Sequence, residues 1–392
     1  MKFKRYRIAD LLDEISMGPF GSNIKKECFV ETGVPVLNGS NLTGIALNDD
    51  EFRYVTEEKA DSLGKANAHR SDVVVTHRGT LGQISFIPET SKYERYVISQ
   101  SQFRFRCNEK VLPEYLTYYF HTRKGQYDLL SNASQVGVPA LARATTTFQQ
   151  LEVEIPDIVE QHKIVEIFEN FRKKMEINIK INNNLSDLLQ TIYQEQFGDG
   201  NLITSQGILS DIGSYSKEKV AVSELNVNTY FSTENMLPGK AGSTEATNLP
   251  DTPQTTACRK GDTLISNIRP YFKKIVYCED TCGCSTDVLC FTPVQSQYAA
   301  YLFSTLYTDK FFAFMLAGSK GTKMPRGDKQ HIMTYPIVLP TENELEEFNA
   351  IAFPVIEQIN SNKVENKRLS ALRDALLPKL LSGEIDISTI DF

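Results

Sequence analysis

Residues 157–197 read DIVEQHKIVEIFENFRKKMEINIKINNNLSDLLQTIYQEQF, and residues 341–381 read TENELEEFNAIAFPVIEQINSNKVENKRLSALRDALLPKLL. Each stretch follows a proline and begins as a capping box, in which a polar side chain and a Glu three residues later satisfy free amides. In each stretch, apolar and Asn residues recur at alternating intervals of four and three over about 40 residues. This pattern predicts two coiled-coil helices, each roughly 60 Å long.

The two stretches belong to an internal repeat. They align without a gap at an offset of 184 residues, and the matched pairs are Pro156 with Pro340, Asn178 with Asn362, Asn182 with Asn366, and LSDL at 185–188 with LSAL at 369–372. Upstream the match continues with gaps: SDVVVTHRG at 71–79 resembles GDTLISNIRP at 261–270, and SNASQVGVP at 131–139 resembles LAGSKGTKMP at 316–325. The duplication of a unit of about 190 residues predicts an internal pseudo-two-fold arrangement.

The segments that precede the two helices have the pattern of globular domains. They contain short β-branched or aromatic runs such as DVVVTH, QFRFRC, DTLISNI and VLCFTP, together with helical stretches such as PEYLTYYFHTRKGQYDLL and SQYAAYLFSTLYTDKFFAFML. Strand-like and helix-like runs in one segment predict a mixed α/β (α+β) fold. The expected order is a globular domain at 1–156, a spacer helix at 157–198, a second globular domain at 199–340, a second spacer helix at 341–382 and a tail at 383–392.

The two helices are predicted to pack against each other as an antiparallel coiled coil. Asn at a coiled-coil seam is tolerated opposite another polar group, where it fixes the register and lowers the stability. An antiparallel register places Asn178 opposite Asn366 and Asn182 opposite Asn362. The predicted interface residues are Ile164, Phe168, Met175, Asn178, Asn182, Leu185, Leu189, Val355, Ile359, Asn362, Asn366, Leu369 and Leu376. The alternative is that each helix packs on its own globular domain.

Composition places the chain among intracellular proteins without excluding nucleic acid as a partner. The 392 residues suffice for two or three domains, and the net charge is −7. Both globular segments are nevertheless neutral, with 19 basic and 19 acidic residues in 1–156 and 13 of each in 198–340, so a local basic cluster remains possible. No apolar run is long enough for a membrane span, the start lacks signal-peptide features, and seven cysteines are typical of reduced thiols. We expect a soluble cytoplasmic protein.

No catalytic motif is recognisable, so we expect no catalytic residues and no enzymatic activity in this chain. The phosphate-loop, dinucleotide, zinc-protease and serine-hydrolase patterns are absent, as is the methyltransferase signature N-P-P-F/Y. The best metal candidates are the thiols of Cys258, Cys278, Cys282, Cys284 and Cys290. Structural zinc sites usually use paired C-x2–4-C knuckles, which this spacing does not form. Buried reduced thiols are the preferred interpretation, and we predict no metal site.

Polar and basic loops recur at matching places in the two globular segments, and they are the candidate DNA contacts. Cations on Gly-rich loops suit phosphate contacts, and Arg suits bidentate contact with guanine. The candidates are Asn38, Asn41, His77, Arg78, Thr80, Gln135 and Arg143 in the first segment and Asn267, Arg269, Tyr271, Lys273, Lys274, Lys320, Lys323, Arg326 and Lys329 in the second. For any single residue, an ordinary solvated loop is an equally good explanation. Similar scaffolds with different loop chemistry predict two different targets.

The whole pattern resembles the specificity (S) subunit of Type I restriction–modification systems. The strings that carry the resemblance are IADLLDEISMGPFGSN at 8–23, GVPVLNGSNL at 33–42, SDVVVTHRG at 71–79, LEVEIPDIVEQHKIVEIF at 151–168 and LSALRDALLPKLLSGEI at 369–385. The last two are the most specific, and the resemblance covers essentially the whole chain. The opening of the second globular segment, GILSDIGSYSKEK, departs more from the usual pattern.

The resemblance implies a division of labour within a complex. Each globular domain would be a target-recognition domain that reads one half of a bipartite site on double-stranded DNA. The helices would space the two domains and bind two modification (M) subunits, which hold S-adenosylmethionine and flip out an adenine for methylation. Two restriction (R) subunits that use ATP and Mg would join where they are present, and this chain would hold no cofactor itself. The alternative is a non-catalytic two-headed adaptor that binds protein or RNA partners.

Overall fold

The computed structural model describes residues 1–134, 137–198, 206–321 and 323–387. The chain divides into two compact units. The first unit contains Met1–Lys174 and Lys367–Phe392, and the second contains Met175–Asn366. Each unit therefore includes one globular segment together with part of both long helices.

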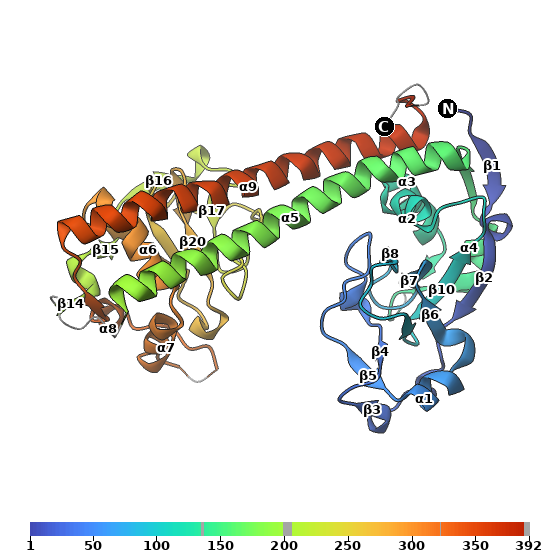
Figure 1. Ribbon diagram of the computed structural model, residues 1–392, viewed down its shortest axis with the longest axis horizontal. Coiled ribbons are helices and arrows are strands. Elements are labelled where there is room, and N and C mark those ends of the chain that lie inside the picture. The colour runs from blue at the N-terminus through green and yellow to red at the C-terminus, as the bar shows by residue number, and fades with distance from the viewer. Residues whose placement is uncertain (135–136, 199–205, 322, 388–392) are drawn as a thin grey trace. The chain divides into compact units, whose positions relative to one another are not determined.

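The two long helices are α5, Ile158–Phe197, and α9, Glu342–Ser382 (Figure 1). Both begin with the predicted cap. The amide of Glu160 donates to the side chain of Asp157 at 3.1 Å, and Thr341 and Glu344 each accept a hydrogen bond from the other's amide, at 3.3 and 2.8 Å. These bonds satisfy amides that the first helical turn leaves free.

A four-stranded antiparallel sheet forms the centre of the first globular segment. Its order is β2-β10-β7-β8, with β2 at Leu12–Met17, β10 at Gln102–Cys107, β7 at Asp72–Thr76 and β8 at Ile84–Phe86. On the central strand, Phe103 lies opposite Met17 on one side and Val75 on the other. Helix α2, Pro113–His121, packs against β7 and β8. The runs DVVVTH and QFRFRC are thus strands, as predicted.

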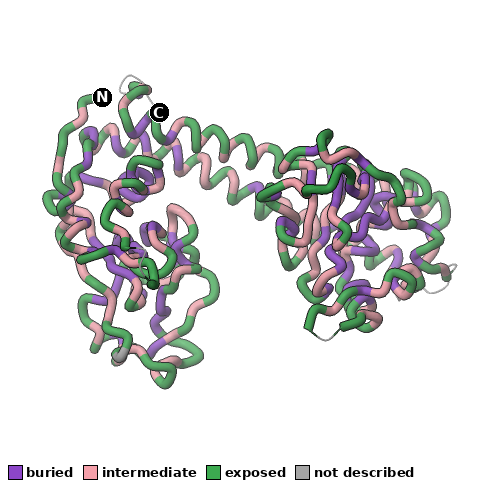
Figure 2. Tube along the Cα trace, turned by 180° about the vertical axis from the view of Figure 1, so that it is seen from behind, coloured by how far each residue is buried: buried purple, intermediate pink, exposed green. Residues whose placement is uncertain are grey.

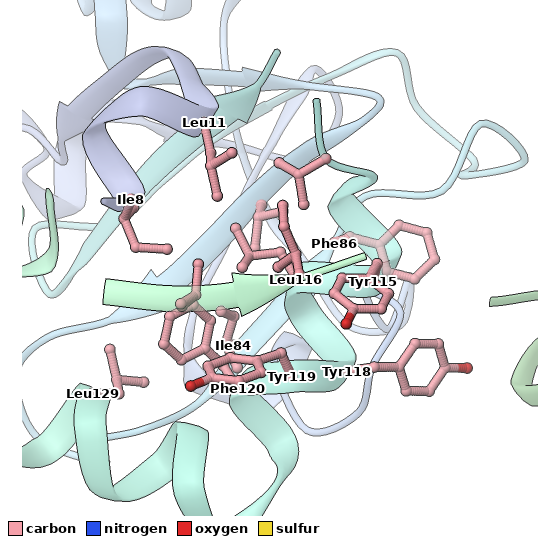
Figure 3. Close-up of a cluster of buried hydrophobic side chains, with 14 of the residues drawn as sticks. Ile8, Leu11, Ile84, Phe86, Tyr115, Leu116, Tyr118, Tyr119, Phe120 and Leu129 are labelled. Atoms are coloured by element: carbon pink, nitrogen blue, oxygen red, sulfur yellow. The ribbon is translucent and has the colours of Figure 1, made fainter. Parts of the chain in front are cut away.

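The core of the first unit combines this sheet with both long helices. Figure 3 shows side chains of the 3-10 helix Ile8–Leu11, of β8, of α2 and of α3 converging on one another. Ile164 and Phe168 of α5 and Leu377 and Leu380 of α9 belong to the same buried cluster. The ring of Phe168 lies 5.1 Å from that of Tyr118 in α2. In this unit the helices pack on each other and on the globular segment, so the two predicted packing modes coexist.

A second sheet in the first unit was not predicted. Its order is β3-β5-β4-β9-β6, and β4 and β9 pair in parallel at Val36 and Val97. Its strands are β3 Phe29–Val30, β4 Val34–Val36, β5 Arg53–Val55, β6 Asn67–His69 and β9 Arg95–Val97. The remaining elements are β1 Lys4–Arg7 paired with β13 Glu152–Ile155, β11 Ala133–Ser134 paired with β12 Ala140–Leu141, α1 Glu57–Ser62, α3 Arg123–Leu130 and α4 Ala144–Gln150.

The second unit repeats the central sheet in the same strand order. Strands β15 Gly213–Tyr215, β22 Val288–Pro293, β19 Thr263–Ser266 and β20 Ile275–Tyr277 form an antiparallel sheet in the order β15-β22-β19-β20. Strands β16 Lys219–Ala221, β18 Gln254–Cys258, β21 Cys282–Cys284 and β17 Tyr230–Phe231 form a second sheet, and β14 Gln206–Ile208 pairs with β23 Pro336–Val338. The helices are α6 Ala299–Tyr307, α7 Asp309–Ala317 and α8 Lys329–Met333.

The core of the second unit is also shared with both long helices. Tyr193 and Phe197 of α5 lie with their rings 5.6 and 4.9 Å from that of Tyr301 in α6, and Phe197 lies 5.5 Å from Phe348 of α9. Figure 2 shows buried residues concentrated inside each globular segment. None of the helices in the described part of the chain has the length and apolar character needed to cross a membrane.

Short 3-10 helices connect many of these elements. They span Ile8–Leu11, Gly21–Asn23, Lys26–Cys28, Gly39–Asn41, Gly64–Ala66, Leu209–Asp211, Val222–Glu224, Pro270–Phe272 and Ser296–Tyr298.

Candidate nucleic-acid interface

In the first unit, the loop after strand β7 is fixed to the segment around β12. The amide of Gly79 donates to the carbonyl of Pro139 at 2.9 Å, and Arg78 forms an isolated antiparallel bridge with Ala140. Two segments that are about 60 residues apart in the sequence therefore lie side by side where strand β7 ends. We call this end of the central sheet the first edge, and its counterpart in the second unit the second edge. The first edge carries the polar residues predicted around positions 77–80.

The loop that contains Asn38 is fixed to the same edge by Gln83. The Gln83 amide group donates to the carbonyl of Gly39 at 3.0 Å and accepts from the hydroxyl of Thr76 at 3.3 Å. Thr76 is the last residue of β7. The side chain of Asn38 is exposed and caps a short 3-10 helix by accepting from the amide of Ser40 at 2.8 Å. Asn38 thus stays at the edge as a candidate contact.

Asn41 does not belong to the candidate contacts, and its prediction as a DNA-binding residue was wrong. Its side chain is fully buried. The Nδ2 group donates to the carbonyls of Asn48 and Asp50 at 3.1 and 2.9 Å, and Oδ1 accepts from the amide of Asn38 at 3.0 Å. Three hydrogen bonds occupy the amide group in closing the loop, so Asn41 acts on the interface only by shaping its backbone.

The other predicted residues of this edge differ in exposure. Arg78, Thr80 and Arg143 are exposed, and within the described residues neither guanidinium forms a hydrogen bond or ion pair. The ring of His77 is partly buried, and its Nε2 lies 3.2 Å from the carbonyl of Gln100. Burial lowers the pKa of His77 because the charged ring is poorly solvated there. Gln135 lies outside the described residues.

The second unit contains the same backbone arrangement at the matching place. The amide of Arg269 donates to the carbonyl of Pro325 at 2.8 Å, and Ile268 forms an isolated bridge with Arg326, which also bridges Lys320. These are the contacts made by Gly79 with Pro139 and by Arg78 with Ala140 in the first unit, at positions that the sequence repeat aligns. The repeat therefore builds one edge twice, with different side chains on each copy.

Arg326 and Lys320 project from this second edge in exposed ion pairs. Arg326 lies 3.1 Å from Asp287, and Lys320 pairs with Asp328, which lowers the pKa of that carboxyl to about 2. Exposed ion pairs contribute little to stability, so phosphate can replace these carboxylates at small cost. Arg269, at the start of the 3-10 helix Pro270–Phe272, is partly buried.

Lys323, Lys329 and Tyr271 are also exposed in the second unit. Lys329 lies over the ring of Tyr215, with 5.8 Å between its nitrogen and the ring centre. Within the described residues, the ammonium of Lys323 has no hydrogen-bond or ion-pair partner. Together with Arg326 and Lys320, these residues give the second edge a positive, partly aromatic character.

Two predicted contacts of the second unit are occupied by the protein itself, and a third is buried. The ammonium of Lys273 lies 3.0 Å from Asp309, and that of Lys274 donates to the carbonyl of Thr233 at 2.5 Å. Burial lowers the pKa of Lys274. Asn267 is 9% exposed, and its backbone N–H donates to the carbonyl of Asp287 at 2.8 Å. We therefore assign these three residues to the framework of the edge rather than to direct DNA contact.

Comparison with known proteins finds a family match for the first part of the chain. Residues 3–187 match the family described as Type I restriction modification DNA specificity domain. The chain is 34% identical over 71 residues to the Type I restriction enzyme MjaIX specificity subunit of Methanocaldococcus jannaschii, which covers 18% of this chain and 16% of that protein. It is 43% identical over 49 residues to the Type I restriction enzyme HindI specificity subunit of Haemophilus influenzae, which covers 12% of this chain and 11% of that protein.

The match to the specificity-domain family covers residues 3–187, just under half of the 392 residues. The fold is similar to that of a solved structure, the Type-I restriction-modification system S subunit from M. genitalium, with a TM-score of 0.58. That likeness covers 97% of this chain and 96% of the other at 16% sequence identity. The matches to the two curated specificity subunits each span less than a fifth of those proteins.

The predicted helix-interface residues are distributed over both units. Ile164, Phe168 and Leu376 lie in or against the core of the first unit, and Leu185, Leu189, Val355 and Ile359 lie in or against the core of the second. Within the second unit, the amide groups of Asn178 and Asn366 bond at 2.8 Å, and those of Asn182 and Asn362 bond at 2.8 Å. Met175 belongs to the second unit and Leu369 to the first.

Sequence reasoning missed Gln83, Gln100 and Phe20 at the first edge. Gln83 holds the Asn38 loop through its side-chain amide, and Gln100 contacts the His77 ring through its backbone carbonyl. No local pattern marks a glutamine side chain for the first role, and any residue supplies the carbonyl of the second. Phe20 is 84% exposed in the run GPFGSN, where an apolar residue between two glycines was a visible signal.

Proposed function

We propose that this chain is the DNA sequence-specificity subunit of a Type I restriction–modification complex. Residues 1–156 and 199–340 are target-recognition domains, each of which reads one half of a bipartite site on double-stranded DNA. The observation that carries the proposal is the duplicated sheet edge, in which one backbone arrangement presents Arg78 in the first unit and Arg326 with Lys320 in the second. A common frame with different side chains suits the recognition of two different half-sites.

The catalytic steps belong to partner subunits in this proposal. A modification subunit holds S-adenosylmethionine and methylates an adenine that has been flipped out of the duplex. A restriction subunit, where the system has one, uses ATP and Mg. This chain contributes recognition and geometry, with no catalytic residue and no cofactor of its own, and it acts in the cytoplasm.

The helices at 157–198 and 341–382 are proposed to set the separation of the two half-sites and to bind two modification subunits. An exposed face of α5 supports this role, because Ile177, Ile181 and Leu188, at spacings of four and seven residues on one side of the helix, remain 40–51% exposed. Apolar side chains that face water on a long helix are typical of a surface that a partner covers. Two restriction subunits would join the assembly through the modification subunits.

The deciding experiment is to coexpress the chain with an adenine methyltransferase partner and to sequence the methylated sites. Replacing residues 1–156 with the first domain of another family member is expected to change one half-site and to preserve the other half-site and the gap. If both half-sites change together, the two domains do not read DNA independently. If no site is methylated and the complex binds protein or RNA instead, the two-headed adaptor is the better description.

A further inference from the structure

The most exposed large apolar side chain in the described part of the molecule is Phe20, at 84%. It lies in the loop between β2 and β3, with Pro19 before it and Gly21 after it. Scattered exposed apolar residues are common on protein surfaces, so exposure alone indicates no function. The conformation of this loop and its position supply the further observations.

Close backbone contacts on both sides of Phe20 fix the loop. The amide of Gly18 donates to the carbonyl of Gln102 at 2.8 Å, and a Cβ on Gly18 would lie 1.9 Å from the carbonyl oxygen of Ser99. A Cβ on Gly21 would lie 2.0 Å from Oε1 of Gln100. At Gly18 the obstacle is backbone, so no other residue fits without moving a strand end. These contacts constrain the backbone on both sides of Phe20, whose ring is exposed.

Phe20 lies at the same edge as the candidate DNA contacts of the first unit. The side chain of Gln100 abuts Gly21, and the backbone carbonyl of Gln100 lies 3.2 Å from Nε2 of the His77 ring. The exposed Arg78 follows His77 directly, and exposed Lys25 and Lys26 follow Phe20 on its own loop. An apolar ring is thus presented among cations on a surface made of polar loops.

We propose that Phe20 inserts as an apolar wedge at a base step of the half-site read by the first domain. This inference rests on the proposed function. Side chains of this type enter between base pairs from the minor groove, and neighbouring cations hold the flanking phosphates. The surrounding Lys and Arg favour DNA over a protein partner, because the centres of protein–protein interfaces are depleted in Lys.

Among its described residues, 206–321 and 323–340, the second domain has no counterpart of this loop, so we expect an effect on the first half-site alone. Strand β15 ends at Tyr215, and β16 begins only four residues later at Lys219. Val220, in β16, is 9% exposed. A change at Phe20 should therefore affect the half-site of the first domain and leave that of the second domain unchanged.

The test compares Phe20→Ala and Phe20→Trp in the full chain, assembled with its methyltransferase partner, on a duplex that carries the methylated site. Loss of one stacked base contact predicts that Phe20→Ala weakens binding roughly 5- to 100-fold, and that Phe20→Trp retains it.

A 2-aminopurine placed in the first half-site should change its fluorescence when the wild-type complex binds, and respond less with Phe20→Ala. In the full chain without partner, Phe20→Trp supplies the only tryptophan, so its quenching by DNA reports stacking directly.

The control variant is Tyr127→Ala, which removes another strongly exposed aromatic ring, 75% exposed, from α3 of the same domain. It should leave binding unchanged, and an equal loss in this variant would overturn the proposal. Unchanged affinity with Phe20→Ala, when wild type binds the site, refutes the wedge but not the proposed function. Failure of wild type to bind the site refutes the proposed function. Loss of assembly with the methyltransferase in Phe20→Ala, measured by light scattering, would identify Phe20 as a protein contact instead.

Discussion

The thiol of Cys290 donates a hydrogen bond to the carboxylate of Asp262, with 3.2 Å between sulfur and oxygen. In the first unit the aligned carboxylate is Asp72, which is fully buried and bonded by Arg104 and Arg106 on the neighbouring strand. The sheet registers align Arg104 with Cys290. One buried acid at the same place in the fold is thus held by guanidinium groups in one unit and by a thiol in the other.

This difference predicts responses of unequal size to the same substitution in the two units. Asp72→Asn removes the fully buried carboxylate that pairs with Arg104 and Arg106, while Glu14 stays 3.0 Å from Arg104, and we expect a loss of about 1.5–3 kcal/mol in the free energy of unfolding. Asp262→Asn keeps a group that accepts from Cys290 and the amide of Arg259, and we expect a change of about 1 kcal/mol or less. Urea unfolding of the full chain measures both. Equal losses in the two variants would contradict this account.

Asp262 also makes the stability of the second unit depend on pH. Burial raises the pKa of its carboxyl above the ordinary value of 3.8. The folded state therefore binds the proton of Asp262 more tightly than the unfolded state does. The stability that this proton binding adds to the folded state falls as the pH rises from 3.8 to the folded pKa. The stability difference between Asp262→Asn and wild type should grow in favour of the variant over that range and then level off. A difference that stays flat from pH 3.5 to 7 would refute the assignment.

The Asn pairs of the second unit predict non-additive effects. Asn362 donates to Asn182 at 2.8 Å, and Asn182 donates to the carbonyl of Ile359 at 3.2 Å. Asn362→Leu alone leaves the partly buried Oδ1 of Asn182 without this donor, which costs about 1 kcal/mol. Replacing both residues by Leu should recover that loss or stabilise the chain. Thermal unfolding of the two single variants and the double variant gives the coupling, and strictly additive losses would contradict the pairing.

The second sheet edge predicts which lysines contribute to DNA affinity. Lys320→Ala with Lys323→Ala should weaken binding to all sequences alike and reduce the dependence of log K on log salt by about 0.9 for each lost phosphate contact. Lys273→Ala with Lys274→Ala is the matched control, because these ammonium groups face Asp309 and the carbonyl of Thr233. Titrations at several salt concentrations measure the slopes. A larger change in the control pair would move the DNA surface to the 270–274 loop.

Arg326 should act on specificity rather than on general affinity. Its guanidinium is exposed beside Asp287 at the edge of the second domain. If it contacts a base, Arg326→Ala should cost about 1–3 kcal/mol on the true site and relax one position of one half-site. Sequencing of the sites methylated by the variant complex tests this. A uniform loss across all sequences would instead make Arg326 a phosphate contact.

The long helices were predictable because a stripe repeated over many turns leaves little ambiguity, and the pairing of four Asn fixed the antiparallel register. The sheet β3-β5-β4-β9-β6 could not be predicted, because strands of two or three residues such as Phe29–Val30 are too short to show an alternation of apolar and polar residues. The candidate site was predicted in part. Asn41 looked like an exposed turn residue, because nothing local shows that Asn48 and Asp50 direct their carbonyls at it. Lys273 and Lys274 looked free because Asp309 and Thr233 are distant in sequence.

The discontinuity of the first unit has a consequence for synthesis on the ribosome. Its core includes Leu377, Leu380 and Ile387 beside Ile164 and Phe168, whereas the second unit is one continuous segment, Met175–Asn366. At 5–20 residues per second, the ribosome needs about 10–40 s to travel from the first part of that core to the last. The domain that is encoded first is therefore completed last, and Ile164 and Phe168 stay without their α9 neighbours throughout that interval. Because the second unit also needs α9 up to Asn366, it is completed only about 20 residues before the first, and both cores close near the end of synthesis.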